Sequence, residues 1–217
     1  MLRIILLAFC LLAAACVAPN DTVSDDLDNQ KDLSPAEVED DIFLSVLEGI
    51  HDVDVNLPQS PITWKTCSGE VLDHPCNLEG PDQRGDVFGL YALYGHPIVL
   101  DFSTAWCGPC MNAAAHVQDV QDLYRDSGLI YITILIETEN GSTPTQADVA
   151  AWAADYGITD SPVVASSRKV LRSGGGTWGL SGWPTFYYID SEMVLRDIDR
   201  GYSEQEVIHS IDWLLTL

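Results

Sequence analysis

Residues 98–110 read Ile-Val-Leu-Asp-Phe-Ser-Thr-Ala-Trp-Cys-Gly-Pro-Cys, and this stretch decides the fold. Its first five residues, 98–102, are almost continuously apolar, which is typical of a central strand covered on both faces. From Cys107 to about Asp126 the apolar residues recur at helical spacing and form one stripe, made of Ala113, Val117, Val120 and Tyr124. We therefore predict a buried strand, a short turn and a helix that begins at or beside Cys107.

The position of the two cysteines at this helix start predicts redox chemistry. A thiol there faces unpaired backbone N–H groups and the positive end of the helix dipole, and both stabilise a thiolate. Because the thiolate attacks disulfides, Cys107 is the predicted nucleophile, and Cys110, one turn further along, is the predicted resolving residue. Gly108 leaves room for a partner chain, and Pro109 fits the first turn because its missing N–H would have had no partner.

Two other uses of a CxxC pair are a purely structural disulfide and half of a zinc site. Zinc needs two more ligands at close spacing, and the sequence contains no second CxxC and no HxxxH. The strand–turn–helix context also argues against a simple staple. We therefore predict a redox-active disulfide between Cys107 and Cys110, with no metal and no cofactor.

The rest of the main domain alternates strand and helix patterns. We predict a second buried strand at 129–136, a helix between Thr145 and Gly157, a hairpin of strands 185–189 and 193–198, and a last helix capped by Ser203. This order implies an α/β fold with a mixed central sheet and helices on both faces.

The N-terminus carries an export signal. Arg3 is followed by apolar or small residues at 4–17, a run too short to span a bilayer. Its end, Leu12-Ala13-Ala14-Ala15-Cys16, resembles a bacterial lipobox, in which Cys16 would be lipidated. The alternative is an ordinary signal cleaved after Ala-x-Ala, with Cys16 an incidental thiol. We predict a lipoprotein signal at 1–16 and a lipid-anchored protein of the bacterial cell envelope, facing the periplasm or the surface and not cytoplasmic.

Three further segments follow the signal. Residues 17–33 are acidic and nearly free of large apolar groups, so we predict a flexible tether. Residues 34–61 begin with the capping-box pattern Ser-Pro-Ala-Glu and predict a helical extension, and 62–217 form the main domain. The chain has 33 acidic residues against 10 Lys and Arg, a net charge of −23. Such a charge repels phosphate backbones, so we expect no nucleic-acid partner.

Cysteine usage agrees with export. Without Cys10 in the signal and the lipidated Cys16, four cysteines remain, and an even number in an exported chain suggests two pairs. Cys67 and Cys76 flank a polar, turn-rich stretch, so local pairing into a structural disulfide is the simplest connectivity. The alternative is a second shuttling pair that passes electrons to Cys107.

Two motifs resemble a known family. The segment from Asp101 to Cys110 resembles the active-site segment of thioredoxins, and Gly182-Trp183-Pro184-Thr185-Phe186 resembles their cis-proline loop. About 45 residues separate the 129–136 strand from Pro184, and this insertion is similar to the TlpA/ResA-like, redoxin-type branch of the superfamily. Residues 77–97 resemble the lead-in hairpin of that branch. The resemblance covers 62–216 and implies a thioredoxin-like fold with an N-terminal helix/hairpin extension and an insertion before the cis-proline.

The resemblance also implies roles for site residues. Asp101 matches the buried acid that accepts a proton from the resolving Cys110; the alternative is a solvated acid at a strand end. A lysine common on the neighbouring strand is absent, with Thr133 the nearest match, so we expect different proton handling.

The same family pattern implies residues that position the substrate. Backbone groups beside Pro184 would pair with a substrate chain across from Cys107. Trp106, Gly108, Pro109 and Trp183 complete the predicted substrate-positioning set, and Trp183 is bulkier than the residue usual before the proline.

These features predict a membrane-tethered thiol–disulfide oxidoreductase. The Gly-Pro pair between the cysteines accompanies reducing members of the family, so we expect reduction of protein disulfides. The partners would be protein thiols and disulfides in the cell envelope and an upstream electron donor. One alternative is a peroxiredoxin-like peroxidase, although residues 102–105 lack the proline of that site. Another is a non-catalytic lipoprotein that keeps the fold as a binding scaffold, as copper-handling relatives do with a wider CxxxC.

Overall fold

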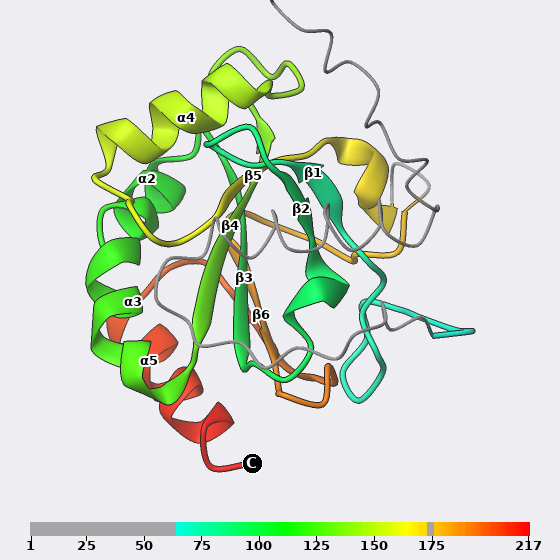
Figure 1. Cartoon of the computed structure of the whole chain (residues 1–217). Helices are drawn as coiled ribbons and strands as arrows, with labels where there is room; N and C mark the ends of the chain where they lie inside the picture. Colours follow the sequence, from blue (N-terminus) through cyan, green and yellow to red (C-terminus); the bar gives the residue numbers. More distant parts are fainter. Residues whose placement is uncertain (1–63, 173–175) are drawn as a thin grey trace, which may run out of the picture. The chain divides into compact units, whose positions relative to one another are not determined.

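The computed structural model of the chain describes residues 64–172 and 176–217 (Figure 1). The predicted signal with Cys16, the tether and the helix expected within 34–61 lie outside the described residues. No helix of the described part has the length and apolar character needed to cross a membrane.

The core of the fold is a five-stranded mixed sheet with the order β5-β4-β3-β6-β7. Central strand β3 (Ile98–Thr104) runs parallel to β4 (Ile130–Glu137) and antiparallel to β6 (Thr185–Ile189). The outer strands are β5 (Val163–Ala165), parallel to β4, and β7 (Leu195–Arg200), antiparallel to β6. Every residue of β3 and β4 is buried, as their apolar sequences predict. The four predicted strands are thereby confirmed, with ends shifted by two residues at most.

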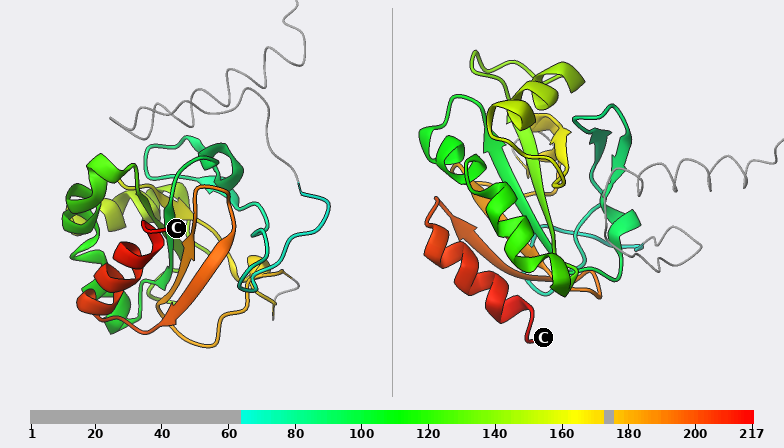
Figure 2. Two further views of the ribbon diagram at one scale, coloured as in Figure 1. Left: turned by 90° about the horizontal axis from the view of Figure 1, so that it is seen from below. Right: turned by 60° about the vertical axis from the view of Figure 1, so that its left-hand side comes forward.

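All four described α-helices lie on one face of the sheet (Figures 1 and 2). They are α2 (Gly108–Ala114), α3 (Val117–Tyr124), α4 (Gln146–Asp155) and α5 (Glu204–Leu214). The connections β3–β4 and β4–β5 run in the same direction along the sheet. Because such parallel connections are right-handed in nearly all proteins, both place their helices on the same face. The second face carries the short 3₁₀ helices η1 (Leu90–Leu93) and η3 (Arg168–Val170).

The predicted lead-in hairpin is present and packs on this second face. Its strands are β1 (Glu79–Pro81) and β2 (Val87–Gly89), and Phe88 is buried with the core side chains of β3 and β4. Gly80 lies so close to the backbone of Ala165 that a Cβ atom would come within 2.3 Å of its carbonyl oxygen. The hairpin therefore covers the exposed edge of β5, and only glycine permits this approach.

The helix predicted as one element from Cys107 to Asp126 is two helices, so this prediction is wrong. The break falls at His116, whose ring nitrogen Nδ1 donates to the carbonyl oxygen of Asn112 at 2.8 Å. A continuing helix would give that carbonyl to the backbone N–H of His116, which bonds to Ala113 instead, at 2.9 Å. Because the imidazole takes the Asn112 carbonyl in place of the backbone N–H, helix α2 ends here and α3 begins at Val117.

The predicted helix ends of α4 and α5 are confirmed. Thr145 and Asp148 form a reciprocal capping box at the start of α4, and Gly157 follows its end in the left-handed conformation at φ 66°. At α5 the hydroxyl of Ser203 accepts a hydrogen bond from the backbone N–H of Glu206.

Trp178 anchors the inserted segment against the strand that leads to the cysteines. Its side chain is fully buried, and its ring centroid lies 5.1 Å from that of Phe102 and 4.9 Å from that of Tyr187. Aromatic contacts of this kind combine a large buried area with a defined geometry. The end of β3 is therefore held from the second face while α2 packs on the first.

Candidate active site

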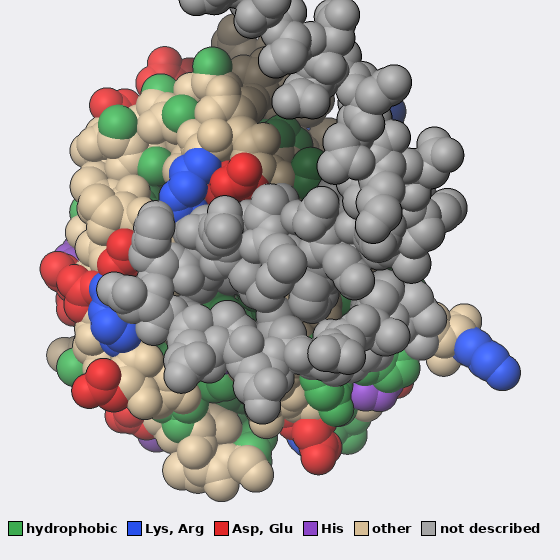
Figure 3. Space-filling model, viewed as in Figure 1, with side chains coloured by type: hydrophobic (Ala, Val, Ile, Leu, Met, Phe, Trp, Pro, Cys, Tyr) green, Lys and Arg blue, Asp and Glu red, His purple; other side chains and the backbone are tan. Residues whose placement is uncertain are grey.

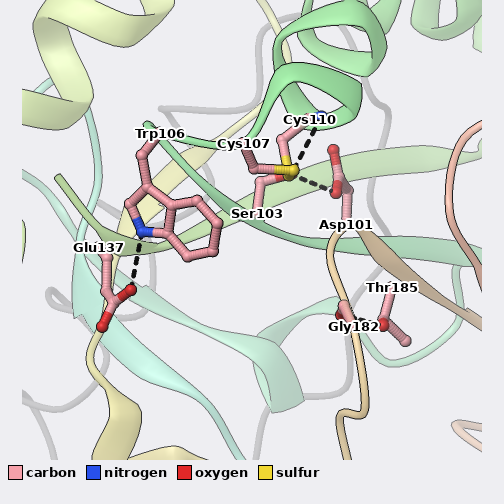
Figure 4. The surroundings of a disulfide bond; sticks show 8 residues. All are labelled: Asp101, Ser103, Trp106, Cys107, Cys110, Glu137, Gly182 and Thr185. Atoms are coloured by element: carbon pink, nitrogen blue, oxygen red, sulfur yellow. Dashed lines mark hydrogen bonds between the residues drawn. A yellow bond between two sulfur atoms is a disulfide. The ribbon is translucent and has the colours of Figure 1, made fainter. Parts of the chain in front are cut away.

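Cys107 and Cys110 lie at the start of helix α2, directly after the turn that follows strand β3. Cys107 is the N-cap residue of α2, and Pro109 lies in the first turn. The two cysteines form a disulfide with their Cα atoms 5.2 Å apart, and the Cys107 sulfur accepts a hydrogen bond from the backbone N–H of Cys110 at 3.3 Å (Figure 4). Cys107 is 6% exposed whereas Cys110 is 0% exposed, so a partner reaches only Cys107. This asymmetry matches the predicted nucleophile and resolving residue.

Asp101 is completely buried, and its side chain lies on the face of β3 that α2, α3, α4 and α5 cover. Its carboxylate accepts hydrogen bonds from the hydroxyls of Ser103, at 2.7 Å, and Tyr131, at 3.4 Å. Burial raises the pKa of Asp101 from 3.8 to about 7, although both hydrogen bonds act in the opposite direction. A carboxyl group with this pKa exchanges a proton readily near neutral pH, and the alternative of a solvated acid is excluded by its burial.

The sequence alone did not predict the hydrogen-bond partners of Asp101. Thr133 does lie opposite Asp101 in the parallel register, but its buried hydroxyl has no hydrogen-bond partner among the described residues. The contact comes from Tyr131, two residues earlier on the same face of β4. Strand alternation would have found both partners, because Ser103 and Tyr131 stand two positions from Asp101 and Thr133.

Trp106, directly before the nucleophile, is held by Glu137, a contact that the sequence did not predict. Its indole N–H donates to Glu137 at 2.9 Å, while 45% of the side chain stays exposed (Figure 4). Glu137 is 8% exposed and forms an ion pair with Arg168, which lowers the pKa of Glu137. In the sequence, Glu137 could have been noticed as the only charged residue of β4, at the end of the strand. Arg168 holds Glu137, and Glu137 in turn fixes the indole plane of Trp106 beside the disulfide.

The predicted cis-proline loop lies beside the same end of β3. The Trp183–Pro184 peptide bond is cis, and Thr185 pairs with Phe102 in the antiparallel register of β6 and β3. The Thr185 hydroxyl donates to the carbonyl oxygen of Gly182 at 2.9 Å, which braces the loop (Figure 4). Trp183 is half-buried and packs against the core of the second face, whereas Gly182 is exposed.

The second disulfide joins Cys67 and Cys76, with their Cα atoms 4.8 Å apart. Its loop pairs with the start of β7, because the N–H of Leu72 bonds to the carbonyl of Leu195 at 2.7 Å. Leu195 lies opposite Ile189, which lies opposite Ile98 at the start of β3, while Cys107 follows the end of β3. The residues between Cys67 and Cys76 therefore pair near the start of β3, whereas the redox disulfide follows its end. This placement favours the structural role over a second shuttling pair, and that role stays a prediction.

Within 64–172 and 176–217, no three His, Cys, Asp or Glu side chains gather closely enough to hold a metal ion.

The sequence is similar to those of known proteins. The model of the AhpC/TSA family matches residues 71–198. The thioredoxin-like protein YneN of Bacillus subtilis is 22% identical over 129 residues, which are 59% of this chain and 71% of that protein.

Solved structures share the fold at low identity. A putative thiol:disulfide interchange protein DsbE from Chlorobium tepidum superposes with a TM-score of 0.56 at 21% identity, covering 68% of this chain and 99% of that one. The exposed lipoprotein thioredoxin Etrx1 of Streptococcus pneumoniae does so with a TM-score of 0.52 at 22% identity, covering 65% and 100%. The predicted thioredoxin-like fold is confirmed.

Proposed function

The chain belongs to the AhpC/TSA family, and we propose that it is a membrane-tethered thiol–disulfide oxidoreductase that reduces protein disulfides in the cell envelope. The oxidoreductase class follows from the family together with the disulfide at the start of α2. One observation carries the proposal: the partly accessible Cys107 sulfur accepts a backbone N–H, while its partner Cys110 is fully buried. The hydrogen bond stabilises Cys107 as the attacking thiolate. Burial keeps Cys110 for the second step, the attack that releases the target protein.

The proposed cycle transfers two electrons. The Cys107 thiolate attacks one sulfur of the target disulfide, a mixed disulfide forms, and the other target sulfur leaves as a thiolate that takes up a proton. Cys110 then gives its proton to Asp101 and attacks the Cys107 sulfur, which releases the second target thiol. The target is reduced, the Cys107–Cys110 disulfide forms, and a dithiol donor restores the pair.

The reducing direction is the part of the proposal with a quantitative test. We expect the reduction potential of the Cys107–Cys110 pair to lie below about −200 mV, nearer to thioredoxin at about −270 mV than to DsbA at about −120 mV. The measurement equilibrates the full chain in graded dithiol/disulfide buffers and quantifies free thiols by alkylation and mass spectrometry.

A matched control removes the other disulfide. The Cys67→Ser/Cys76→Ser variant should have the same potential, because that pair belongs to a loop bonded to the start of β7 and contributes no group to the redox centre. A potential near −120 mV would assign the protein to the oxidants and overturn the reducing direction.

The proposed tether rests on the lipobox-like segment that ends at Cys16. In a bacterial host the wild-type chain should incorporate labelled fatty acid and sediment with membranes, whereas Cys16→Ser should do neither. Cys10→Ser is the matched control, since Cys10 is removed with the signal and its loss should leave the anchor intact. Unchanged labelling and sedimentation of Cys16→Ser would remove lipidation from the proposal.

A further inference from the structure

A pocket of about 360 Å³ opens directly beside the redox centre. Ala105, two residues before Cys107, and Met111, the residue after Cys110, form its near side. Strand β4 contributes Leu135, and helix α4 contributes the aromatic rings of Trp152 and Tyr156. The volume is within the range of ordinary ligand sites, which are lined mainly by apolar groups with a few polar ones.

The aromatic wall of the pocket is well defined. Trp152 is 6% exposed, and its ring centroid lies 4.7 Å from that of Tyr156. The rings of Trp152 and Tyr156 therefore give the pocket a rigid apolar wall that suits an apolar side chain.

The rim of the pocket is negatively charged. Asp148, Asp155 and Glu139 line it, and no Lys or Arg does among the residues that the structure describes. Asp155 and Glu139 both face Tyr156, because after burial their charges are what raise the pKa of its hydroxyl. Acidic side chains also lie along the edge formed by α3 and α5, with Lys or Arg among them (Figure 3). A neighbouring basic group would thus be attracted, and an acidic one repelled.

We propose that this pocket binds the substrate protein beside its reacting cysteine and selects an apolar side chain next to Lys or Arg. The inference rests on the proposed function, because Cys107 must first meet a protein disulfide. Two residues place Ala105 within about 7 Å of Cys107, measured between Cα atoms. An extended substrate advances about 3.3 Å per residue, so a side chain two to four residues from its cysteine reaches the pocket.

The test uses two peptides that differ in one charge. Each contains one cysteine, blocked as a neutral mixed disulfide with 2-mercaptoethanol, and a leucine three residues away, with either Lys or Glu beside the leucine. The pre-reduced full chain should react with the Lys peptide about tenfold faster at low salt, measured as a second-order rate constant. The ratio should shrink at high salt, where the Debye length is short.

Three variants test whether the faster reaction of the Lys peptide comes from the pocket. Glu139→Gln/Asp155→Asn should lower the Lys/Glu ratio to below about threefold, because the rim loses two charges. Asp126→Asn/Glu192→Gln removes the same charge from two exposed acids outside the pocket and should keep the ratio near ten. Ala151→Phe, on the exposed side of α4, should fill the pocket and slow both peptides equally.

The outcomes separate the inference from the function on which it rests. A ratio near one in the wild type, or an equal drop in both double variants, would overturn the pocket as the specificity site. Wild-type reduction of the small neutral disulfide of 2-mercaptoethanol would then show that the redox centre still works. Failure to reduce that compound or either peptide would overturn the proposed function itself.

Discussion

Replacing Cys107 with serine is expected to abolish turnover of a protein disulfide, at least about 1000-fold, because serine supplies no thiolate to attack sulfur. Replacing Cys110 with serine should instead stop the cycle halfway. Cys107 still attacks, but no resolving thiol follows, so about one equivalent of mixed disulfide accumulates on Cys107. Cys107 is the accessible sulfur and Cys110 is fully buried, so the reverse pattern is not expected. Non-reducing electrophoresis and mass spectrometry of the adduct measure both results.

The Cys67→Ser/Cys76→Ser variant serves as control for the loss of a disulfide as such. Opening that short loop should lower the free energy of unfolding by about 2–3 kcal/mol while turnover continues. Turnover by Cys107→Ser, or a mixed disulfide found on Cys110, would contradict the assigned roles. In the native host, the partners trapped by Cys110→Ser identify the substrates.

The sequence predicted those parts of the fold that depend on local patterns. The continuous apolar runs located β3 and β4, and Thr145 and Ser203 located the starts of α4 and α5. The sequence did not predict the helix break at His116, because the apolar stripe of Ala113, Val117 and Val120 keeps helical spacing across it. What breaks the helix there is a contact between a ring nitrogen and a carbonyl, which periodicity does not report.

The candidate site shows the same limit. The CxxC motif and the cis-proline loop were found because each occupies a continuous segment, whereas the residues that tune them come from other strands. Glu137 reaches Trp106, and Tyr131 reaches Asp101, only because β4 pairs with β3 in one particular register. The pocket depends on how α4 packs beside the start of α2, which is again a tertiary contact. The lipid anchor and the tether stay predictions.

Replacing Asp101 with asparagine is expected to stabilise the protein and slow it. The pKa of Asp101 is about 7 in the folded protein, against an ordinary value of 3.8. Between these two values the folded state binds the extra proton, so the free energy of unfolding falls as pH rises, by about 1.4 kcal/mol per unit. Above pH 7 the loss is complete, at up to about 4 kcal/mol. Asparagine does not titrate, so denaturation at pH 8 should show a gain of that order that fades toward pH 4.

The kinetic cost of Asp101→Asn should appear in the second half of the cycle. Without a proton acceptor, attack by Cys110 on the mixed disulfide should slow about 100-fold at pH 7, whereas formation of that disulfide by Cys107 changes little. In the wild type this step should accelerate with a midpoint near pH 7, and that inflection should vanish in the variant. Stopped-flow reactions that follow release of the second target thiol resolve the two steps.

Ser103→Ala provides the matched control, because it keeps the carboxyl group and removes only a hydrogen bond that lowers its pKa. The midpoint should therefore move above pH 7, and the stability loss should extend to higher pH by the same amount. Tyr131 and Tyr202 also face Asp101, but the pKa of each is raised, so neither titrates in this window. A midpoint that Ser103→Ala leaves unmoved would assign the inflection to another group, and unchanged stability of Asp101→Asn at pH 8 would show that the buried carboxyl carries no charge there.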